Sequence, residues 1–128
     1  MQHLNSKCRE RDVENETKIQ DLLLRYSEGF DVGRLRGYGV IRRCDNGFKI
    51  GPLFADNAGI ALDLFNGLSD HAAAEAIFID VPEINDAALQ IVRDKEMKEV
   101  FGCARMYFGH KPALPDAHIY GVTTFELG

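Results

Sequence analysis

The chain has 128 residues, of which 45% are hydrophobic, and a formal net charge of −5 at pH 7. This length is typical of one domain, and the apolar fraction is sufficient for one ordinary core. The acidic balance disfavours a phosphate backbone as a partner, so nucleic-acid binding is not expected, and no apolar run approaches the ~20 residues of a membrane span. The polar N-terminus lacks an apolar signal region, which predicts a cytoplasmic protein.

Cysteine and histidine usage gives no sign of a metal centre. Cys8, Cys44 and Cys103 are an odd number at wide spacing, and neither a CxxC nor an HxxxH motif occurs. We therefore expect reduced thiols, no disulfide framework and no metal site. Because no histidine is adjacent to Cys44 or Cys103, nucleophilic catalysis by cysteine is not expected either.

The chain begins with a polar segment. Residues 1–17 mix charged side chains with few apolar ones, which predicts a flexible arm ahead of a single domain at residues 18–128. Residues 19–30 fit either a strand or a short helix, since consecutive leucines cannot decide between the two. Residues 34–43 alternate as a strand does, and residues 45–47 (Asp-Asn-Gly) predict a hairpin turn.

The partner strand of this hairpin is expected at residues 48–55. Pro52 follows Gly51 there and cannot donate to a strand ladder, so a bulge or a sheet edge is expected at this point. A helix follows Asp56, the expected N-cap. One apolar stripe at helical spacing marks that helix: Ile60, Ala61, Leu64, Phe65 and Leu68. Basic residues around the hairpin predict a solvated face: Arg34, Arg36, Arg42, Arg43 and Lys49.

The second half of the chain continues this alternation. A nearly continuous apolar run at residues 76–81 predicts a strand covered on both faces. Asn85 is expected to cap a second helix with its own buried stripe. Residues 103–108 predict a strand, and residues 119–127 predict a last strand rich in β-formers. The resulting order, ββαβαββ, predicts an α/β (α+β) fold in which two main helices pack on a mixed sheet. The stripe of the second helix consists of Ala88, Ile91 and Val92.

Four stretches resemble the GNAT N-acetyltransferase superfamily: residues 37–41, 49–55 and 79–85, and the tail at 121–128, which resembles the GNAT-like C-terminal acetyltransferase domain branch. The resemblance implies a GNAT-like fold and transfer of an acyl group from acetyl-CoA to an amine, on a small molecule or on a protein. It also implies a set of coenzyme A contacts, partly through backbone: Leu53, Phe54, Ala55, Gly59, Ile60, Ala61 and Asn85.

Two of the implied contacts have alternative roles. Residues 56–61 match the family's pyrophosphate loop, in which backbone N–H groups at a helix N-terminus hold the anion. Gly59 and Ala61 are retained, whereas the family's leading Gln or Arg is Asp56 here. Asp56 is therefore either a helix cap or part of a retained anion site, and Asn85 is either a cofactor contact or a helix cap.

The catalytic residues are harder to identify. The family's frequent tyrosine acid corresponds to Val92, which cannot donate a proton. A general base would come from a carboxylate, for which Asp80 and Glu83 are the candidates, with Glu126 as a further acidic residue. Asp80 lies inside the apolar run, where it is either a perturbed base or a hydrogen-bonded structural residue. Three tyrosines are expected to serve in packing: Tyr38, Tyr107 and Tyr120.

The N-terminal third also bears on assembly. Residues 1–33 are short and polar for the strand and two helices that open a complete GNAT domain. An exposed sheet edge or apolar face is therefore expected, and with it a homo-oligomer. Three functions remain open: an N-acyltransferase with full, reduced or lost activity, a non-catalytic module for an acyl-CoA or another anion, and a dimerising interaction domain.

Overall fold

The computed structural model describes residues 2–4, as backbone only, and residues 34–125. Its elements confirm the predicted fold class, a mixed α/β arrangement, and after the first strand they follow the predicted order ββαβαββ. They are β1 (Gln2–Leu4), β2 (Gly37–Cys44), β3 (Gly47–Ala55), α2 (Ala58–His71), β4 (Ile77–Ile79), α3 (Asp86–Asp94), β5 (Lys98–Glu99), the 3-10 helix η3 (Asp116–His118) and β6 (Ile119–Gly121).

Only one part of the predicted N-terminal arm lies within the described residues. The strand β1 falls within the segment predicted as an arm, and it pairs in parallel with both β4 and β5. The other residues of the arm, and the element predicted at residues 19–30, lie outside the described residues.

The hairpin of β2 and β3 forms as predicted. The strands are antiparallel from Gly37 opposite Ala55 to Cys44 opposite Gly47, with the turn at residues 45 and 46. A Cβ atom on Gly47 would lie 2.2 Å from the carbonyl oxygen of Ala76, so only glycine fits against the start of β4. The expected irregularity beside Gly51 is also present, because the register shifts opposite that point of β3.

The two halves of β3 have different neighbours. Its first half runs parallel to β4, with Phe48 opposite Ile77 and Ile50 opposite Ile79. Beyond Ile50 the strand leaves β4, and its second half pairs in antiparallel fashion with β6. The other edge of β6 continues to β4, where the N–H of Val122 donates to the carbonyl of Asp80 at 2.9 Å. The strand β6 therefore fills the gap that opens between β3 and β4.

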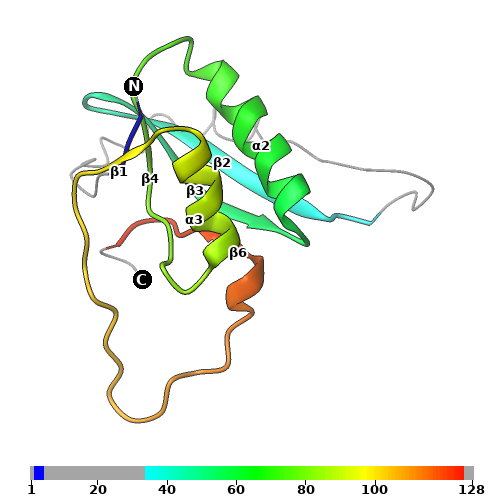
Figure 1. Ribbon diagram of the computed structural model, residues 1–128, viewed down its shortest axis with the longest axis vertical. Coiled ribbons are helices and arrows are strands. Elements are labelled where there is room, and N and C mark those ends of the chain that lie inside the picture. The colour runs from blue at the N-terminus through cyan, green and yellow to red at the C-terminus, as the bar shows by residue number, and fades with distance from the viewer. Residues whose placement is uncertain (1, 5–33, 126–128) are drawn as a thin grey trace.

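Both main helices lie on the same face of the sheet and touch each other (Figure 1). The apolar stripes predicted for α2 and α3 are confirmed, since their members are the buried residues of each helix. Glycines on β2 bring α2 close to the sheet: a Cβ on Gly37 would lie 2.9 Å from Ile60, and one on Gly39 would lie 2.7 Å from Leu68. The core thus sits between the helices and one face of the sheet.

Of the two predicted helix caps, one is correct and one is wrong. Asn85 caps α3, its side-chain oxygen accepting from the N–H of Ala88 at 3.2 Å. The expected cap of α2, Asp56, is wrong: Asn57 is the cap, and its oxygen accepts from the N–H of Ile60 at 3.0 Å. Asp56 instead accepts a hydrogen bond from Arg36.

The strand predicted at residues 103–108 is also wrong. In its place residues 100–115 form an exposed loop, hereafter the 100–115 loop, which projects away from the sheet and helices (Figure 1). The fifth strand is the two-residue β5 ahead of this loop. The last strand is shorter than expected, ending at Gly121, and residues 126 and 127 lie outside the described part of the chain.

The cysteines differ from each other. Cys44 is disulfide-bonded, so the expectation of reduced thiols is wrong for this residue, while Cys103 is free and exposed. Within residues 2–4 and 34–125, no group of three or more His, Cys, Asp or Glu is placed to hold a metal ion. No helix in the same part of the chain is long and apolar enough to cross a membrane.

Candidate functional site

The residues expected to contact coenzyme A form one strand–turn–helix unit. Leu53, Phe54 and Ala55 end β3, and Gly59 lies exposed in the first turn of α2. The backbone N–H groups of Ala58 and Gly59 make no hydrogen bond within the described residues. Such groups at a helix N-terminus are suited to hold an anion.

The charge of Asp56 is matched inside this unit. Its carboxylate lies 3.3 Å from the guanidinium of Arg36, and both side chains are about one-third exposed, at 33% and 30%. The Asp56 carboxylate therefore presents less net negative charge to the helix N-terminus than an isolated carboxylate would. Two further predicted contacts, Ile60 and Ala61, are buried and fix the helix against the sheet.

The second half of β3, which contains Leu53 and Phe54, is paired along both of its edges. Tyr38 and Gly39 of β2 lie opposite these residues on one side, and β6 lies on the other, with Gly121 opposite Leu53. The structure therefore places the chain's own strand beside the backbone that the family resemblance assigns to the donor.

Asn85 connects α3 to β6. Besides capping α3, its amide nitrogen donates to the carbonyl oxygens of Ile119 at 2.9 Å and of Ala117 at 3.4 Å. The residue is 5% exposed. Its role as a helix cap is confirmed, and its remaining polar group holds the start of β6.

Asp80 is fully buried and ion-paired. Its Oδ2 atom lies 2.6 Å from Nζ of Lys49, both side chains being 0% exposed, and it also accepts from the N–H of Phe125 at 2.9 Å. The expectation of a solvated face is therefore wrong for Lys49. The pair joins β3, the end of β4 and the segment after β6, while Arg42 donates to the carbonyl of Thr123 in that same segment at 2.6 Å.

A cavity of about 480 Å³ borders β6. The turn after β4, the 100–115 loop and β6 form its walls. It contains Glu83, a predicted catalytic candidate, but not Asp80. Glu126 lies outside the described residues. The cavity-lining residues are Val81, Pro82, Glu83, Ile84, Leu89, Glu99, Phe101, Gly102, Cys103, Ala104, Arg105, Tyr107, Lys111, Asp116, Ile119, Val122 and Phe125.

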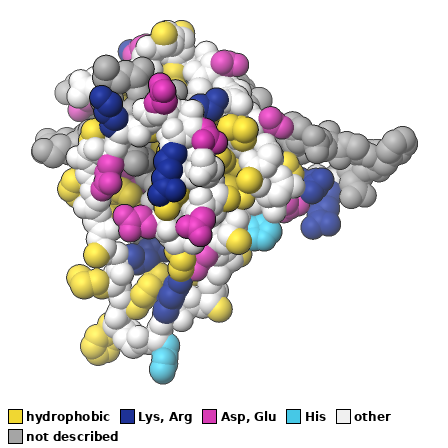
Figure 2. All heavy atoms as spheres, viewed as in Figure 1, with side chains coloured by type: hydrophobic (Ala, Val, Ile, Leu, Met, Phe, Trp, Pro, Cys, Tyr) yellow, Lys and Arg dark blue, Asp and Glu magenta, His cyan; other side chains and the backbone are white. Residues whose placement is uncertain are grey.

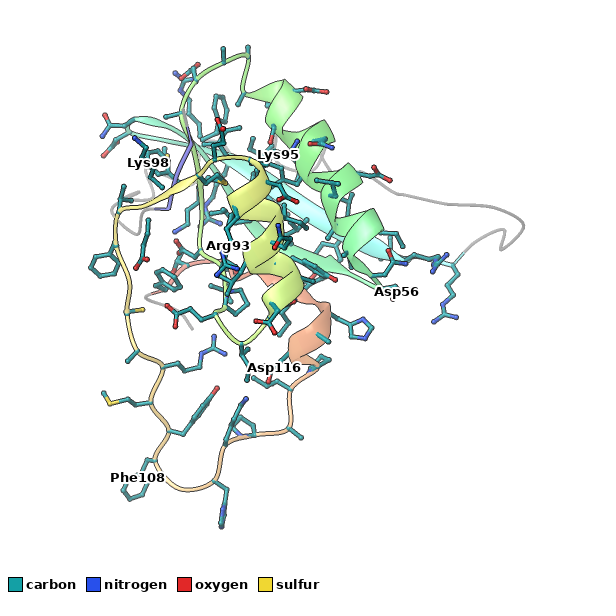
Figure 3. All side chains as sticks on the ribbon, in the orientation of Figure 1. Asp56, Arg93, Lys95, Lys98, Phe108 and Asp116 are labelled. Carbon is teal, nitrogen blue, oxygen red and sulfur yellow. The ribbon has the colours of Figure 1, made fainter. Side chains whose placement is uncertain are left out.

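The charged side chains of the cavity differ in whether they have a partner. Lys111 and Asp116 pair at 2.8 Å, so their charges offset each other (Figure 3 labels Asp116). Glu83 makes no hydrogen bond or ion pair with another described residue. The surrounding wall is aromatic in part, with the rings of Phe101 and Phe125 at 6.4 Å between centroids. A carboxylate without a partner beside apolar walls is complementary to an ammonium group on an apolar body.

Sequence reasoning missed Arg105 and Tyr107 as cavity residues. These two line the cavity, whereas Met106 and Phe108 do not and are exposed at 87% and 111%. Residues 101–105 line it without a break, so no period in the sequence marked this wall. Figure 3 shows Phe108 at the tip of the loop, pointing away from the body of the molecule. Tyr107 was expected to be a packing residue, and its ring instead borders the cavity while 37% exposed.

Tyr120, at the centre of β6, is the titratable group that the fold alters most clearly among those described. Its side chain is 3% exposed and belongs to the core. Burial raises the pKa of Tyr120 above its ordinary value of 10.0, because the phenolate loses solvation there. The residue therefore anchors β6 as a neutral phenol.

Comparisons with known proteins agree with this architecture. Residues 19–121 match the model of a family described as an acetyltransferase (GNAT) domain. Holothin acyltransferase of Pseudoalteromonas sp. (strain SANK 73390) is 28% identical to this chain over 89 residues. The aligned part covers 69% of the chain and 30% of that relative, so the chain spans less than a third of the relative's length. No solved structure gives a significant match.

Proposed function

Because this chain belongs to the GNAT acetyltransferase domain family, we propose that it is an N-acyltransferase domain that moves an acetyl group from acetyl-CoA to an amine. The observation that carries the proposal is the cavity beside β6, which combines the unpartnered carboxylate of Glu83 with apolar and aromatic walls. A protonated amine must lose its proton before it can attack a thioester, and a carboxylate at the site can accept that proton.

The donor half of the proposal rests on the strand–turn–helix unit. The N–H groups of Ala58 and Gly59 would hold the pyrophosphate of coenzyme A, and the Arg36–Asp56 pair limits repulsion at that point. Acetyl-CoA, when bound, supplies an activated acetyl group. The backbone at Leu53 and Phe54 would align its extended arm, as the family resemblance implies.

The acceptor half rests on two cavity residues. Glu83 would accept the proton of the attacking amine, and Tyr107 would donate a proton to the departing thiolate. Tyr107 would then replace the tyrosine acid that Val92 cannot supply, since Val92 is buried and apolar. The acceptor is an amine, carried on a small molecule or on a protein, whose apolar part fills the cavity.

A second function is favoured by a specific observation. The donor edge of β3 is paired with β6, and Val92 occupies the position of the usual tyrosine. A chain with these features suits a non-catalytic module that binds an acyl-CoA or another anion at the start of α2. This alternative predicts saturable binding and no product.

The first experiment is a titration of acetyl-CoA and of free coenzyme A, followed by calorimetry and by the shift of the unfolding temperature. We expect binding that stabilises the fold. Turnover with a panel of apolar amines then separates the enzyme from the binding module. The absence of heat and of any temperature shift at millimolar ligand contradicts both.

A catalytic role for Glu83 has its own test. Glu83→Gln should lower kcat by about 10²–10⁴-fold while leaving the affinity for coenzyme A unchanged, because it removes a base and not a donor contact. Glu75→Gln, an exposed carboxylate outside the cavity, is the matched control. Equal rates for the two variants would remove Glu83 from the mechanism.

We also propose that the protein is a cytoplasmic homo-oligomer that associates through the 100–115 loop. Figure 2 shows apolar side chains on the lower part of the molecule, and the exposed ones on this loop are Val100, Phe101, Met106, Tyr107, Phe108 and Leu114. Such a patch marks association sites. The double variant Met106→Ser/Phe108→Ser should weaken self-association in sedimentation experiments at tens of micromolar protein. A parent chain that stays monomeric there contradicts the proposal.

A further inference from the structure

We propose that β6 is a displaceable strand that competes with the acyl donor for the edge of β3, so that donor binding requires β6 to leave the gap between β3 and β4. This inference rests on the proposed function, because it concerns the regulation of the same site. In the described structure the donor site is therefore closed, because β6 occupies it.

The position of β6 is the first argument. The backbone of Leu53 and Phe54 is the expected contact for the donor's extended arm, and its free edge is used by Gly121 and Ile119. An arm that carries amide groups can pair with a strand edge only where that edge is open. The donor and β6 therefore cannot occupy the edge together.

The place of β6 at both half-sites is the second argument. The cavity with Glu83 is lined by Ile119 and Val122, so it borders β6, and the same strand pairs with the donor edge of β3. In the described structure β6 therefore contributes to both half-sites. Direct acyl transfer needs reacting atoms about 3–3.5 Å apart. Removal of β6 would bring the donor edge and the cavity into one space.

The anchoring of β6 is the third argument. The strand has three residues, and side-chain and backbone groups hold its ends and the segment after it: Asn85 bonds to Ile119, Asp80 to Val122 and Phe125, and Arg42 to Thr123. Its seat is also sterically narrow. A Cβ on Gly121 would lie 3.1 Å from Ile79, and one on Gly51 would lie 2.3 Å from the carbonyl oxygen of Val122.

The chain ahead of β6 permits the movement. Residues 100–113 make no backbone hydrogen bond to any other described residue, and all of them are exposed. A displaced β6 therefore swings on a long tether without breaking α2, α3 or the β2–β3 hairpin. The losses are the backbone pairing of β6 with β3 and Asp80 and the burial of Tyr120 and Val122, which the bound donor has to offset.

A disulfide that locks β6 is the decisive test. Phe54 and Ile119 are register partners across β3 and β6, so a disulfide between cysteines at these two positions would hold β6 on β3. We would make Phe54→Cys/Ile119→Cys in a Cys103→Ser background and measure free coenzyme A binding by calorimetry, oxidised and reduced. The Cys103→Ser parent receives both treatments, which isolates the effect of the native disulfide at Cys44.

The expected result is at least tenfold weaker binding of coenzyme A when the engineered disulfide is closed, with recovery on reduction. A variant in the opposite sense is Gly121→Val, which crowds Ile79 and Leu53 and should loosen β6. It should bind coenzyme A several-fold more tightly than the parent. Hydrogen exchange at the amide of Val122, bonded to Asp80 in the closed state, should accelerate when coenzyme A is added.

The outcomes separate this inference from the proposed function. Equal affinity in the oxidised and reduced double variant overturns the displacement of β6 and leaves an acyltransferase with a donor site elsewhere. Weak binding in the parent together with tighter binding in Gly121→Val supports the displacement. Absence of binding in every variant, with the fold intact by circular dichroism, overturns both.

Discussion

Two regions of the molecule are comparably apolar in sequence: the part built from β2, β3, α2 and β4, and the 100–115 loop. They differ in how far their apolar side chains are buried. In the first part most of the apolar residues are buried, as with Leu64, Phe65 and Leu68. In the loop, Met106 and Phe108 are fully or largely exposed. A hydrophobic pattern therefore specifies an element only where a second surface is available to cover it.

The hairpin shows what such a second surface provides. Residues 37–44 and 47–55 pair with each other across a short turn, so each strand finds its partner locally. Residues 103–108 have the composition of a strand but pair with no strand in the described part of the chain. Without a partner their N–H and C=O groups remain in solvent, and the segment stays a loop.

The largest expected effect concerns the pair Lys49–Asp80, at the centre of the well-packed part. Asp80→Asn leaves the Lys49 ammonium buried without a counter-charge, and should reduce the free energy of unfolding by about 3–5 kcal/mol. The double variant Lys49→Met/Asp80→Asn should recover most of that loss, because the asparagine still accepts from Phe125. Urea denaturation of the two single variants and the double variant completes the cycle. Additive losses would mean that the pair is not coupled.

Two leucines test the comparison directly. Leu68→Ala, at a residue 1% exposed, should cost about 2–5 kcal/mol in the free energy of unfolding through loss of burial and a residual cavity. Leu114→Ala, the same change at a residue 38% exposed in the loop, should stay within about 0.5 kcal/mol. Denaturation midpoints measured side by side decide the matter. A large loss at Leu114 would show that the loop is packed in solution.

The cap of α2 should give an intermediate effect. Asn57→Ala removes the acceptor for the N–H of Ile60 and should cost about 1 kcal/mol of folding free energy. Asn66→Ala, inside the same helix, is the matched control and should be neutral or slightly stabilising, because alanine has the higher helix propensity. If Asp56→Ala proved costlier than Asn57→Ala, Asp56 would be the cap in solution.

The smallest effect is a pH dependence at Tyr120, which lies where the two parts meet. The unfolded chain loses the tyrosine proton near pH 10, while burial keeps the folded pKa higher. The unfolded state therefore binds fewer protons above pH 10, and stability falls as pH rises through that range, with no contribution below it. Tyr120→Phe should flatten this part of the curve in denaturation experiments between pH 8 and pH 11. An unchanged slope would place the Tyr120 ring in solvent.

Most of the fold could be predicted because its signals are local. The stripe of α2, the turn at Asn46 and the cap at Asn85 depend on neighbours within a few residues, and all three are confirmed. Asp56 and Asn57 are both good caps by type, and the choice between them depends on Arg36, twenty positions away. Contacts at that separation leave no periodic trace in the sequence.

The candidate site was less predictable for the same reason. Lys49 looked like one member of a basic surface cluster, because its partner Asp80 is 31 positions away. The turn after β4, the 100–115 loop and β6 line one cavity, so Glu83 and Tyr107 come to border the same space only in three dimensions. The backbone of Leu53 was identified as a donor contact, and that role stays a prediction because β6 lies beside it.

The exposed loop also has a consequence for how the molecule could be divided. Arg105 lies on it with no backbone hydrogen bond to another described residue, which makes the peptide bond after it accessible to trypsin under native conditions, whereas Lys111 precedes Pro112 and is not a trypsin site. A nick there would leave the body of the protein intact and convert the segment that carries β6 into a separate peptide. In that two-piece protein, the dissociation constant of the cleaved peptide from the rest of the chain would measure directly how strongly β6 binds between β3 and β4.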